Sequence, residues 1–344
     1  MAELCIKAGI AALVALLSCA SARADAVADF YRNKTITVYI GYEAGGGYDL
    51  YARTIAKHLP KHVPGNPRAL AQNMPGASSM VLGNYLARIA PRDGTAIGAI
   101  NSALLFDPIF NAESKAQFKG TEMTALGNVV SSASVLLAWK STGITSLADL
   151  KTKPIIIGAT SRSGDTYTLP LAIKKVLGLT AMKIIPGYAG TREVAIALEK
   201  GEVTGRVWDM EGIRAARPTW LTDGSITLVA QLAPEKMPEV PASVALVKEL
   251  VTSAEDNQIL DTIFISTTLA RPYVAPPGLP PDRVAALRTA FMDIMNDAEF
   301  RTDMEKFGMS IGPISGQVMQ KIVADAYALP PAMVDKVRAL LKDE

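Results

Sequence analysis

The residue types that could bind a small anion gather first in a glycine-rich segment. Residues 41–53 read Gly-Tyr-Glu-Ala-Gly-Gly-Gly-Tyr-Asp-Leu-Tyr-Ala-Arg and follow a β-branched apolar run at residues 36–40. Glycines let backbone N–H groups approach a ligand closely, and the first N–H groups of a helix carry a partial positive charge. Because apolar residues at helical spacing follow the glycines, the segment predicts a strand, a loop and a helix that can seat a carboxylate or a phosphate.

This glycine loop does not fit the nucleotide-binding motifs. A dinucleotide fingerprint needs Gly-x-Gly-x-x-Gly, but counting from Gly45 the last position is Leu50. No Gly-Lys-Ser/Thr, which would end a phosphate loop, occurs here. The plainer interpretation is a tight turn in which Asp49 caps the helix.

Four further loops of small or polar residues follow predicted strands, at residues 75–79, 101–102, 160–166 and 187–191. The alternation of strands and helices predicts an α/β fold with parallel, doubly wound sheets. In such sheets ligands bind at the carboxyl ends of the strands, so we expect these loops to line one cleft. The polar and aromatic candidates for a binding site, taken from the five loops and from the end of the strand at 203–208, are Tyr42, Tyr48, Ser78, Asn101, Ser102, Ser161, Thr166, Tyr188 and Asp209.

The first 24 residues have the pattern of an export signal. Lys7 precedes an apolar run at residues 8–17, and small residues follow the run. We expect cleavage after Ala24, which makes the mature chain periplasmic. The alternative is a lipoprotein with a lipidated Cys19, because residues 16–19 resemble a bacterial lipobox.

Composition narrows the classes of function. Both cysteines, Cys5 and Cys19, lie in the predicted signal, so the mature chain offers no disulfide, thiolate metal site or cysteine nucleophile. A net charge of +2 gives no strong field for nucleic acid or an anionic membrane. The two histidines, His58 and His62, match no metal or catalytic motif and are expected at the surface. We therefore expect no metal, no cofactor and no nucleic-acid partner.

A series of short motifs resembles a known family. The chain is similar to the Bug family of extracytoplasmic solute receptors, the binding components of tripartite tricarboxylate transporters. The motifs follow the family's order from the first loop to the C-terminal third. They are the segments at 40–49, 73–77 (Asn-Met-Pro-Gly-Ala), 90–94 (Ala-Pro-Arg-Asp-Gly), 163–164, 186–191 (Pro-Gly-Tyr-Ala-Gly-Thr), 201–203, 207–209 (Val-Trp-Asp) and 274–280.

The resemblance implies a two-lobed type II periplasmic binding protein, a Venus flytrap with a cleft between its lobes. We expect residues 25–127 and 229–344 to form the first lobe and residues 128–228 the second. Such a protein binds a small organic acid and hands it to the membrane permease subunits of the transporter. It is not an enzyme, and we expect a monomer.

The resemblance also implies which loop positions hold the ligand. By position, the first loop supplies Ala44, Gly45, Gly46, Gly47 and Asp49, and the loops of the second lobe supply Ser163, Gly164, Tyr188, Gly190 and Thr191. This chain departs from the family at Ala44, where a proline is usual, and at Ser78, where a glycine is favoured. Glu43 adds a negative charge to the loop, and we expect this side chain to face water.

Two other functions stay open from the sequence. The same clamp could report its occupancy to a membrane signalling partner instead of delivering a solute. A periplasmic enzyme is less well supported, because Thr160 to Gly164 is not a nucleophile elbow and bases are scarce. Arg162 and Arg192 could clamp a carboxylate, although exposure to solvent is their plainer interpretation.

Overall fold

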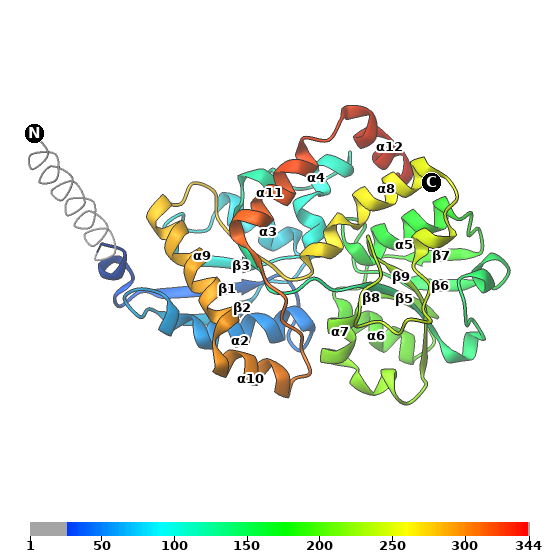
Figure 1. Cartoon of the computed structure of the whole chain (residues 1–344), viewed down its shortest axis with the longest axis horizontal. Helices are drawn as coiled ribbons and strands as arrows, with labels where there is room; N and C mark the ends of the chain where they lie inside the picture. The colour runs from blue at the N-terminus through cyan, green and yellow to red at the C-terminus, as the bar shows by residue number, and fades with distance from the viewer. Residues whose placement is uncertain (1–25, 343–344) are drawn as a thin grey trace, which may run out of the picture.

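The computed structural model describes residues 26–342. The predicted export signal, with Cys19, lies outside the described residues. Figure 1 shows two lobes side by side, each built on one sheet, and this confirms the predicted two-lobed α/β fold. Within residues 26–342, no helix is long and apolar enough to cross a membrane.

The sheet of the first lobe has six strands in the order β11-β4-β10-β3-β1-β2. β1 is parallel to β2 and β3, whereas β10 is antiparallel to β3 and β4, and β11 is antiparallel to β4. The strands are β1 (Thr35–Ile40), β2 (Arg68–Asn73), β3 (Ala96–Ala99), β4 (Thr124–Asn128), β10 (Pro272–Ala275) and β11 (Ile314–Ser315).

The sheet of the second lobe has five strands in the order β7-β6-β8-β5-β9. β6 is parallel to β7 and β8, but β5 is antiparallel to β8 and β9. The strands are β5 (Ser134–Trp139), β6 (Ile155–Gly158), β7 (Met182–Ile185), β8 (Gly205–Asp209) and β9 (Ile226–Leu232).

Both sheets are mixed, so the prediction of parallel sheets is wrong for part of each. Besides the two-residue strand β11, the antiparallel strands are β5 and β10, the first strand that the chain forms in each lobe after crossing from the other. A parallel neighbour requires a crossover of a dozen residues or more that returns the chain to the same end of the sheet, and a crossing between lobes does not provide it.

The helices surround the two sheets. α2 packs against β1, β2, α7, α9 and α10, α5 packs against β7 and β8, and α11 packs against β4. The helices are α2 (Gly47–His62), α3 (Met80–Arg88), α4 (Asp107–Phe110), α5 (Asp165–Val176), α6 (Thr191–Glu199), α7 (Met210–Ala216), α8 (Ala254–Phe264), α9 (Pro281–Asn296), α10 (Ala298–Lys306), α11 (Gly316–Tyr327) and α12 (Pro331–Leu341).

The apolar run before the glycine loop forms the buried centre of the first lobe. Ile36, Val38 and Ile40 of β1 are fully buried and share one apolar cluster with Ile55 of α2 and Phe291 of α9. Complete burial of such a side chain is worth about 1.5–3 kcal/mol. The end of β1 is therefore a rigid base for the loop that follows it.

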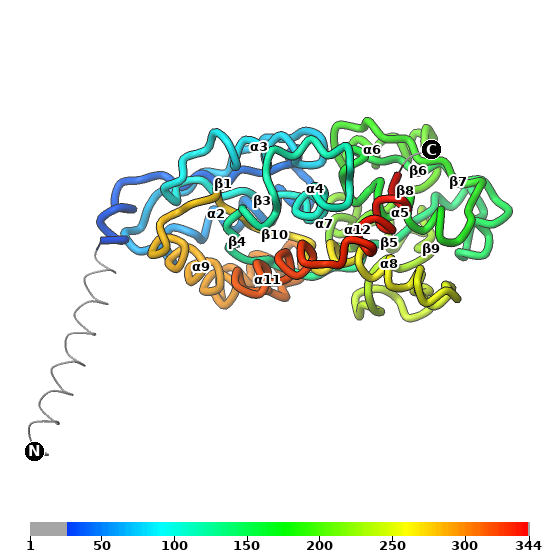
Figure 2. Tube along the Cα trace, turned by 90° about the horizontal axis from the view of Figure 1, so that it is seen from above, coloured from blue at the N-terminus to red at the C-terminus, as the bar shows by residue number. Residues whose placement is uncertain are grey.

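The chain crosses between the sheets twice, over residues 129–133 and after β9. β9 stays paired with β5 as far as Leu232, so residue 228, where we placed the end of the second lobe, lies inside this strand. The last helix, α12, packs against α4, α5 and α8. Figure 2 shows it beside α5 and α8, where the lobes meet.

Candidate ligand-binding site

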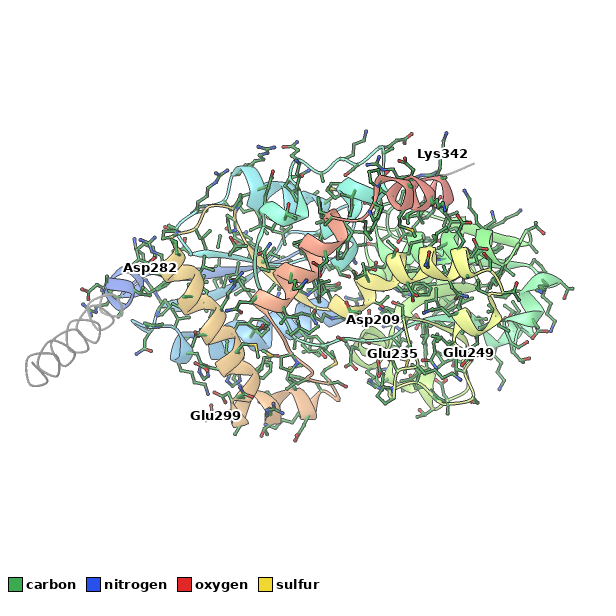
Figure 3. All side chains as sticks on the ribbon, turned by 45° about the horizontal axis from the view of Figure 1, so that its top comes forward. Asp209, Glu235, Glu249, Asp282, Glu299 and Lys342 are labelled. Carbon is green, nitrogen blue, oxygen red and sulfur yellow. The ribbon has the colours of Figure 1, made fainter. Side chains whose placement is uncertain are left out.

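The segments that follow β1, β3, β6 and β7 meet the carboxyl end of β8 between the lobes around a small polar cavity of about 40 Å³. Pockets for small molecules usually measure about 300–1,000 Å³, so the lobes must separate before a solute of several heavy atoms can enter. Figure 3 shows Asp209 of β8 at the junction of the lobes. The lining residues are Tyr42, Tyr48, Asn101, Ser102, Ser132, Ser134, Asp165, Thr166, Thr191, Val207, Trp208, Asp209, Thr267, Ala270 and Arg271.

Asp49 holds the glycine loop in its conformation through hydrogen bonds. Its Oδ2 accepts the backbone N–H of Gly45 at 3.0 Å, and its Oδ1 accepts Arg53 Nε at 2.9 Å and Asn73 Nδ2 at 2.8 Å. Burial opposes its ionisation, but these hydrogen bonds outweigh burial and lower the pKa of Asp49. Gly45 has φ of +88°, a left-handed conformation that glycine adopts without strain.

Arg271 lies beneath the glycine loop and is 2% exposed. Its Nη2 lies 2.5 Å from Asp209 Oδ1, and its guanidinium stacks on Tyr48 at 4.4 Å from the ring centre. A Cβ on Gly47 would lie only 2.7 Å from Arg271 Nη2, so this approach requires glycine at the first position of α2. Burial opposes the charge of Arg271, but Asp209 outweighs burial and the pKa of Arg271 is raised.

Asp165, the first residue of α5, has only neutral partners. Its Oδ1 accepts the Ser266 hydroxyl at 3.0 Å and its Oδ2 accepts the Ser102 hydroxyl at 3.3 Å. Among the residues that the structure describes, no cation pairs with this carboxylate. Burial raises the pKa of Asp165, because the site stabilises its charge less well than water does.

Arg206 of β8 is a second buried guanidinium. It is fully buried, stacks on Trp208 at 3.6 Å from the ring centre and donates Nη1 to the Thr191 carbonyl at 2.8 Å. Its Nε and Nη2 have no partner within the described part of the chain. Burial lowers the pKa of Arg206 to about 9.

The loop before α3 joins the lobes through hydroxyl groups. Ser78 Oγ lies 2.6 Å from Thr160 Oγ1 and 2.8 Å from Ser161 Oγ, both in the second lobe. Ala77, Ser78 and Ser79 all have positive φ, at 45°, 52° and 73°. Such a conformation favours glycine, so this segment stores backbone strain where the lobes touch.

Comparisons with known proteins agree with this architecture. No family model matches the chain. A curated relative, the UPF0065 protein in the gbd 5' region of Cupriavidus necator, is 26% identical over 96% of each chain. The structure of the periplasmic binding protein BugD has a TM-score of 0.72 at 16% identity and covers 90% of this chain and 98% of its own. R. palustris Rpa4515 with adipate has a TM-score of 0.70 at 20% identity and covers 90% and 97%.

A third solved structure, MatC from Rhodopseudomonas palustris with bound malate, has a TM-score of 0.66 at 18% identity and covers 90% of this chain and 99% of its own. The resemblance to the Bug family is confirmed. At 16–20% identity these three structures show that the chain shares their fold.

The structure brings together only part of the binding set that we predicted from the loops and the Bug-family motifs. Cavity-lining residues of that set are Tyr42, Tyr48, Asn101, Ser102, Thr166, Thr191 and Asp209. Ser161 and Tyr188 line a more open groove of about 510 Å³. Ser163 lines a larger cavity of about 650 Å³ beside α12. The others do not line the central cavity: Ala44 is exposed, and Gly45, Gly46, Gly47, Asp49, Ser78, Gly164 and Gly190 stand behind or beside it.

Two glycines of the Bug-family motifs are required by the packing of the lobes and not only by ligand contact. A Cβ on Gly190 would lie 1.7 Å from Glu43 Oε2, and a Cβ on Gly164 would lie 2.2 Å from Ser78 Oγ. In both cases the neighbour comes from the other lobe. These glycines therefore permit the lobes to meet.

The predicted binding set lacks eight of the cavity residues, among them Ser132, Asp165 and Arg271. Asp165 could have been predicted, because it lies inside the loop at 160–166 that we singled out. Ser132 and Arg271 lie on the segments that cross between the lobes. No local motif marks them, since their place depends on contacts far apart in sequence.

The expectation that both histidines lie at the surface is wrong for His58. His58 is not at the surface but 3% exposed, where its Nε2 lies 2.9 Å from Asp303 Oδ2. His58, Asp297 and Glu299 lie close enough to suit a metal ion. However, Lys61 pairs with both carboxylates and His62 Nε2 lies 2.7 Å from Asp297, so side chains of the chain itself already occupy these oxygens. Arg162 and Arg192 are exposed and do not line the central cavity.

Proposed function

We propose that the protein is a periplasmic solute receptor that captures a small carboxylated solute between its lobes and delivers it to the permease of a tripartite tricarboxylate transporter. The observation that carries this proposal is the polar cavity enclosed by loops of both lobes, with helices α5 and α6 beginning at its wall. A solute held there contacts both lobes at once and so favours the closed arrangement by its differential affinity.

The chemistry of the lining supports a carboxylated solute. Neutral donors dominate it, and Thr166 and Thr191 each lie in the first turn of a helix, where backbone N–H groups lack helical partners. Two of the similar structures contain small dicarboxylic acids, adipate in one and malate in the other. Arg271 and the buried Arg206 add positive potential close to the lining.

The proposal includes a location and an assembly state. An export signal at residues 1–24 places the mature chain in the periplasm, with lipidation at Cys19 as the alternative. The mature chain acts as a monomer and carries out no reaction, since its part is to hold the solute and present two closed lobes to the permease. We place the first crossing between the lobes next to residue 128 and the second after β9, which contains the boundary that we predicted at 228–229.

A thermal-shift panel tests the binding function. Mature protein, residues 25–344, is heated with malate, adipate, citrate, aspartate, ATP or buffer alone. Binding to the native state raises the midpoint by mass action. We expect at least one carboxylic acid to raise the midpoint and ATP to leave it unchanged. A shift with ATP alone, or with none of the panel, would contradict the proposal.

A matched pair of threonine variants then locates the site. Thr191 lines the cavity, whereas Thr302 of α10 is exposed far from it in the first lobe. Thr191→Val should weaken binding of the responding acid by about five- to tenfold, the effect of one lost hydrogen bond. Thr302→Val should bind as the wild type does. Equal affinities of all three proteins would place the solute elsewhere.

A further inference from the structure

The charged side chains that line the cavity directly do not balance; the buried guanidinium of Arg206 lies behind the lining, stacked on Trp208. Its lining holds two carboxylates, Asp165 and Asp209, and one guanidinium, Arg271. Arg271 is already paired with Asp209 at 2.5 Å. Asp165 is therefore the carboxylate without a cation among the described residues, and it lines the cavity directly.

Asp165 is held in position by two buried hydroxyls. Ser266 is 4% exposed and Ser102 is 2% exposed, and each donates to one of the two carboxylate oxygens. Ser102 comes from the first lobe and Ser266 from the segment that returns to it, so both hydrogen bonds form where the lobes meet. Neutral donors orient a carboxylate but offset only part of the cost of removing its charge from water.

A second group in the same wall also lacks a partner. Ser132, on the first crossing between the lobes, lines the cavity and is 2% exposed, and its Oγ makes no hydrogen bond within the described residues. Buried hydroxyls are nearly always hydrogen-bonded in native proteins, so an unpaired hydroxyl that lines a binding cavity indicates a hydrogen-bond partner on the bound solute. Ser132 offers a neutral acceptor and donor to a polar group of the solute.

We infer that the solute carries an ammonium group as well as a carboxylate, with Asp165 pairing with the ammonium and Ser132 binding the solute from the crossing segment. This inference rests on the proposed receptor function and narrows its ligand class to amino acids and similar zwitterions. The ammonium supplies the cation that Asp165 lacks. A plain dicarboxylate brings no cation to Asp165 and places a further negative charge beside it.

The remaining lining suits the other end of a zwitterion. Thr191 contributes a hydroxyl at the start of α6, and its carbonyl holds the guanidinium of Arg206 nearby. The carboxylate of an amino acid thus finds donors and positive potential in the same cavity that presents Asp165 to its ammonium group.

Isothermal titration with matched ligand pairs tests this inference. The pairs are succinate with L-aspartate, and adipate with L-2-aminoadipate, so that each pair differs only by an amino group. They are titrated into the wild type, Asp165→Asn and Asp293→Asn. Asp293, an exposed carboxylate on α9, serves as the charge-matched control.

We expect the wild type and Asp293→Asn to bind at least one amino member about tenfold or more tightly than its partner, the effect of a charge-assisted hydrogen bond. In Asp165→Asn that ratio should fall close to one. Ser132→Ala, which retains the charges, should weaken binding of the amino member while it keeps part of the preference. A thermal melt of each variant shows whether it is folded.

The outcomes separate the inference from the receptor function on which it rests. Saturable binding of succinate or adipate by the wild type without preference for the amino partner would overturn the inference alone. So would a folded Asp165→Asn that keeps the wild-type preference. If the wild type binds none of the four acids, the inference fails, and the proposed receptor function fails with it only if no acid of the thermal-shift panel binds either.

Discussion

Glu43 of the first lobe caps helix α6 of the second lobe: its Oε1 accepts the backbone N–H of Arg192 at 3.0 Å. The carboxylate is partly buried between the lobes, so our expectation that it faces water is wrong. The absence of a side chain at Gly190 leaves the space that Glu43 occupies. A helix N-terminus attracts negative charge, so this chain uses a carboxylate of its own to hold the lobes together.

Replacing Glu43 tests whether its hydrogen bond to the Arg192 N–H stabilises the closed arrangement of the lobes. Glu43→Gln keeps the size of the side chain and removes its charge, which should weaken the closed arrangement by about 0.3–1 kcal/mol. Single-molecule fluorescence with one dye on each lobe should then show a larger open population. Glu193→Gln is the control, because Glu193 Oε2 accepts the Ala189 N–H at 2.7 Å within the second lobe. If both variants open the lobes equally, Glu43 has no special part in closure.

Glu211 forms a second set of hydrogen bonds between the lobes. It lies in α7, is 1% exposed and accepts the Ser310 N–H at 3.0 Å and the Tyr51 hydroxyl at 3.3 Å from the first lobe. Arg214 balances its charge at 2.5 Å. Glu211→Ala removes the acceptor of the Ser310 N–H and the counter-charge of Arg214, whereas the Tyr51 hydroxyl keeps the Ser310 carbonyl at 2.7 Å. The loss should cost about 3–5 kcal/mol, visible as a lower thermal midpoint and weaker solute binding.

Glu211→Gln serves as the graded comparison. The amide oxygen can still accept one of the two donors from the first lobe, so this variant should lose less than Glu211→Ala in both measurements. Equal losses, or no loss in either variant, would contradict the role of Glu211 in joining the lobes.

The close contact between Gly47 and Arg271 makes a third prediction. Gly47→Ala places a Cβ 2.7 Å from Arg271 Nη2 and 3.4 Å from the Cα of Gly212 in the second lobe. Crowding of this kind costs about 1–3 kcal/mol. Solute affinity, measured by titration calorimetry, should therefore fall by about five- to a hundredfold. Gly312→Ala, where nothing lies within 4 Å of the new Cβ, should leave the affinity unchanged.

The pairing of α2 with α10 predicts how stability depends on pH. Lys57 Nζ and His58 Nε2 lie 2.6 Å and 2.9 Å from Asp303 Oδ2, and these hydrogen bonds hold the pKa of Asp303 below its ordinary value of 3.8. A depressed pKa means that the contribution of Asp303 to stability is complete above pH 3.8 and is lost as the pH falls through the lowered value.

Urea unfolding of the wild type and of Asp303→Asn at pH 7 and pH 3 measures this contribution. Asp303→Asn should be less stable than the wild type at pH 7, and the difference in the free energy of unfolding should shrink at pH 3. Asp293→Asn, the exposed control, should match the wild type at both values. A difference that grows on acidification would reverse the sign of our argument.

The first loop could be predicted because its signals are local. The apolar residues of β1, the three glycines and the helical spacing after Leu50 lie within one short segment. The direction of β5 and the position of Arg271 could not be predicted, since both depend on where the chain crosses between the lobes. Asp165 lay inside a loop that we chose, but whether a cation neutralises it depends on residues from both lobes. The contact between Glu43 and Arg192 likewise joins segments about 150 residues apart, and no pattern in either one indicates the other.

The central claim, that the lobes close on a small carboxylated solute, is tested most directly by measuring the distance between them. The chain has no cysteine after residue 25, so spin labels on Arg68→Cys of β2 and Lys183→Cys of β7, both exposed, report on one lobe each. Pulsed electron resonance gives the distance between the labels with and without aspartate, adipate or malate. We predict that an acid that raises the thermal midpoint also moves the distribution to one narrow distance. A distribution that stays unchanged with every such acid would contradict closure on the solute.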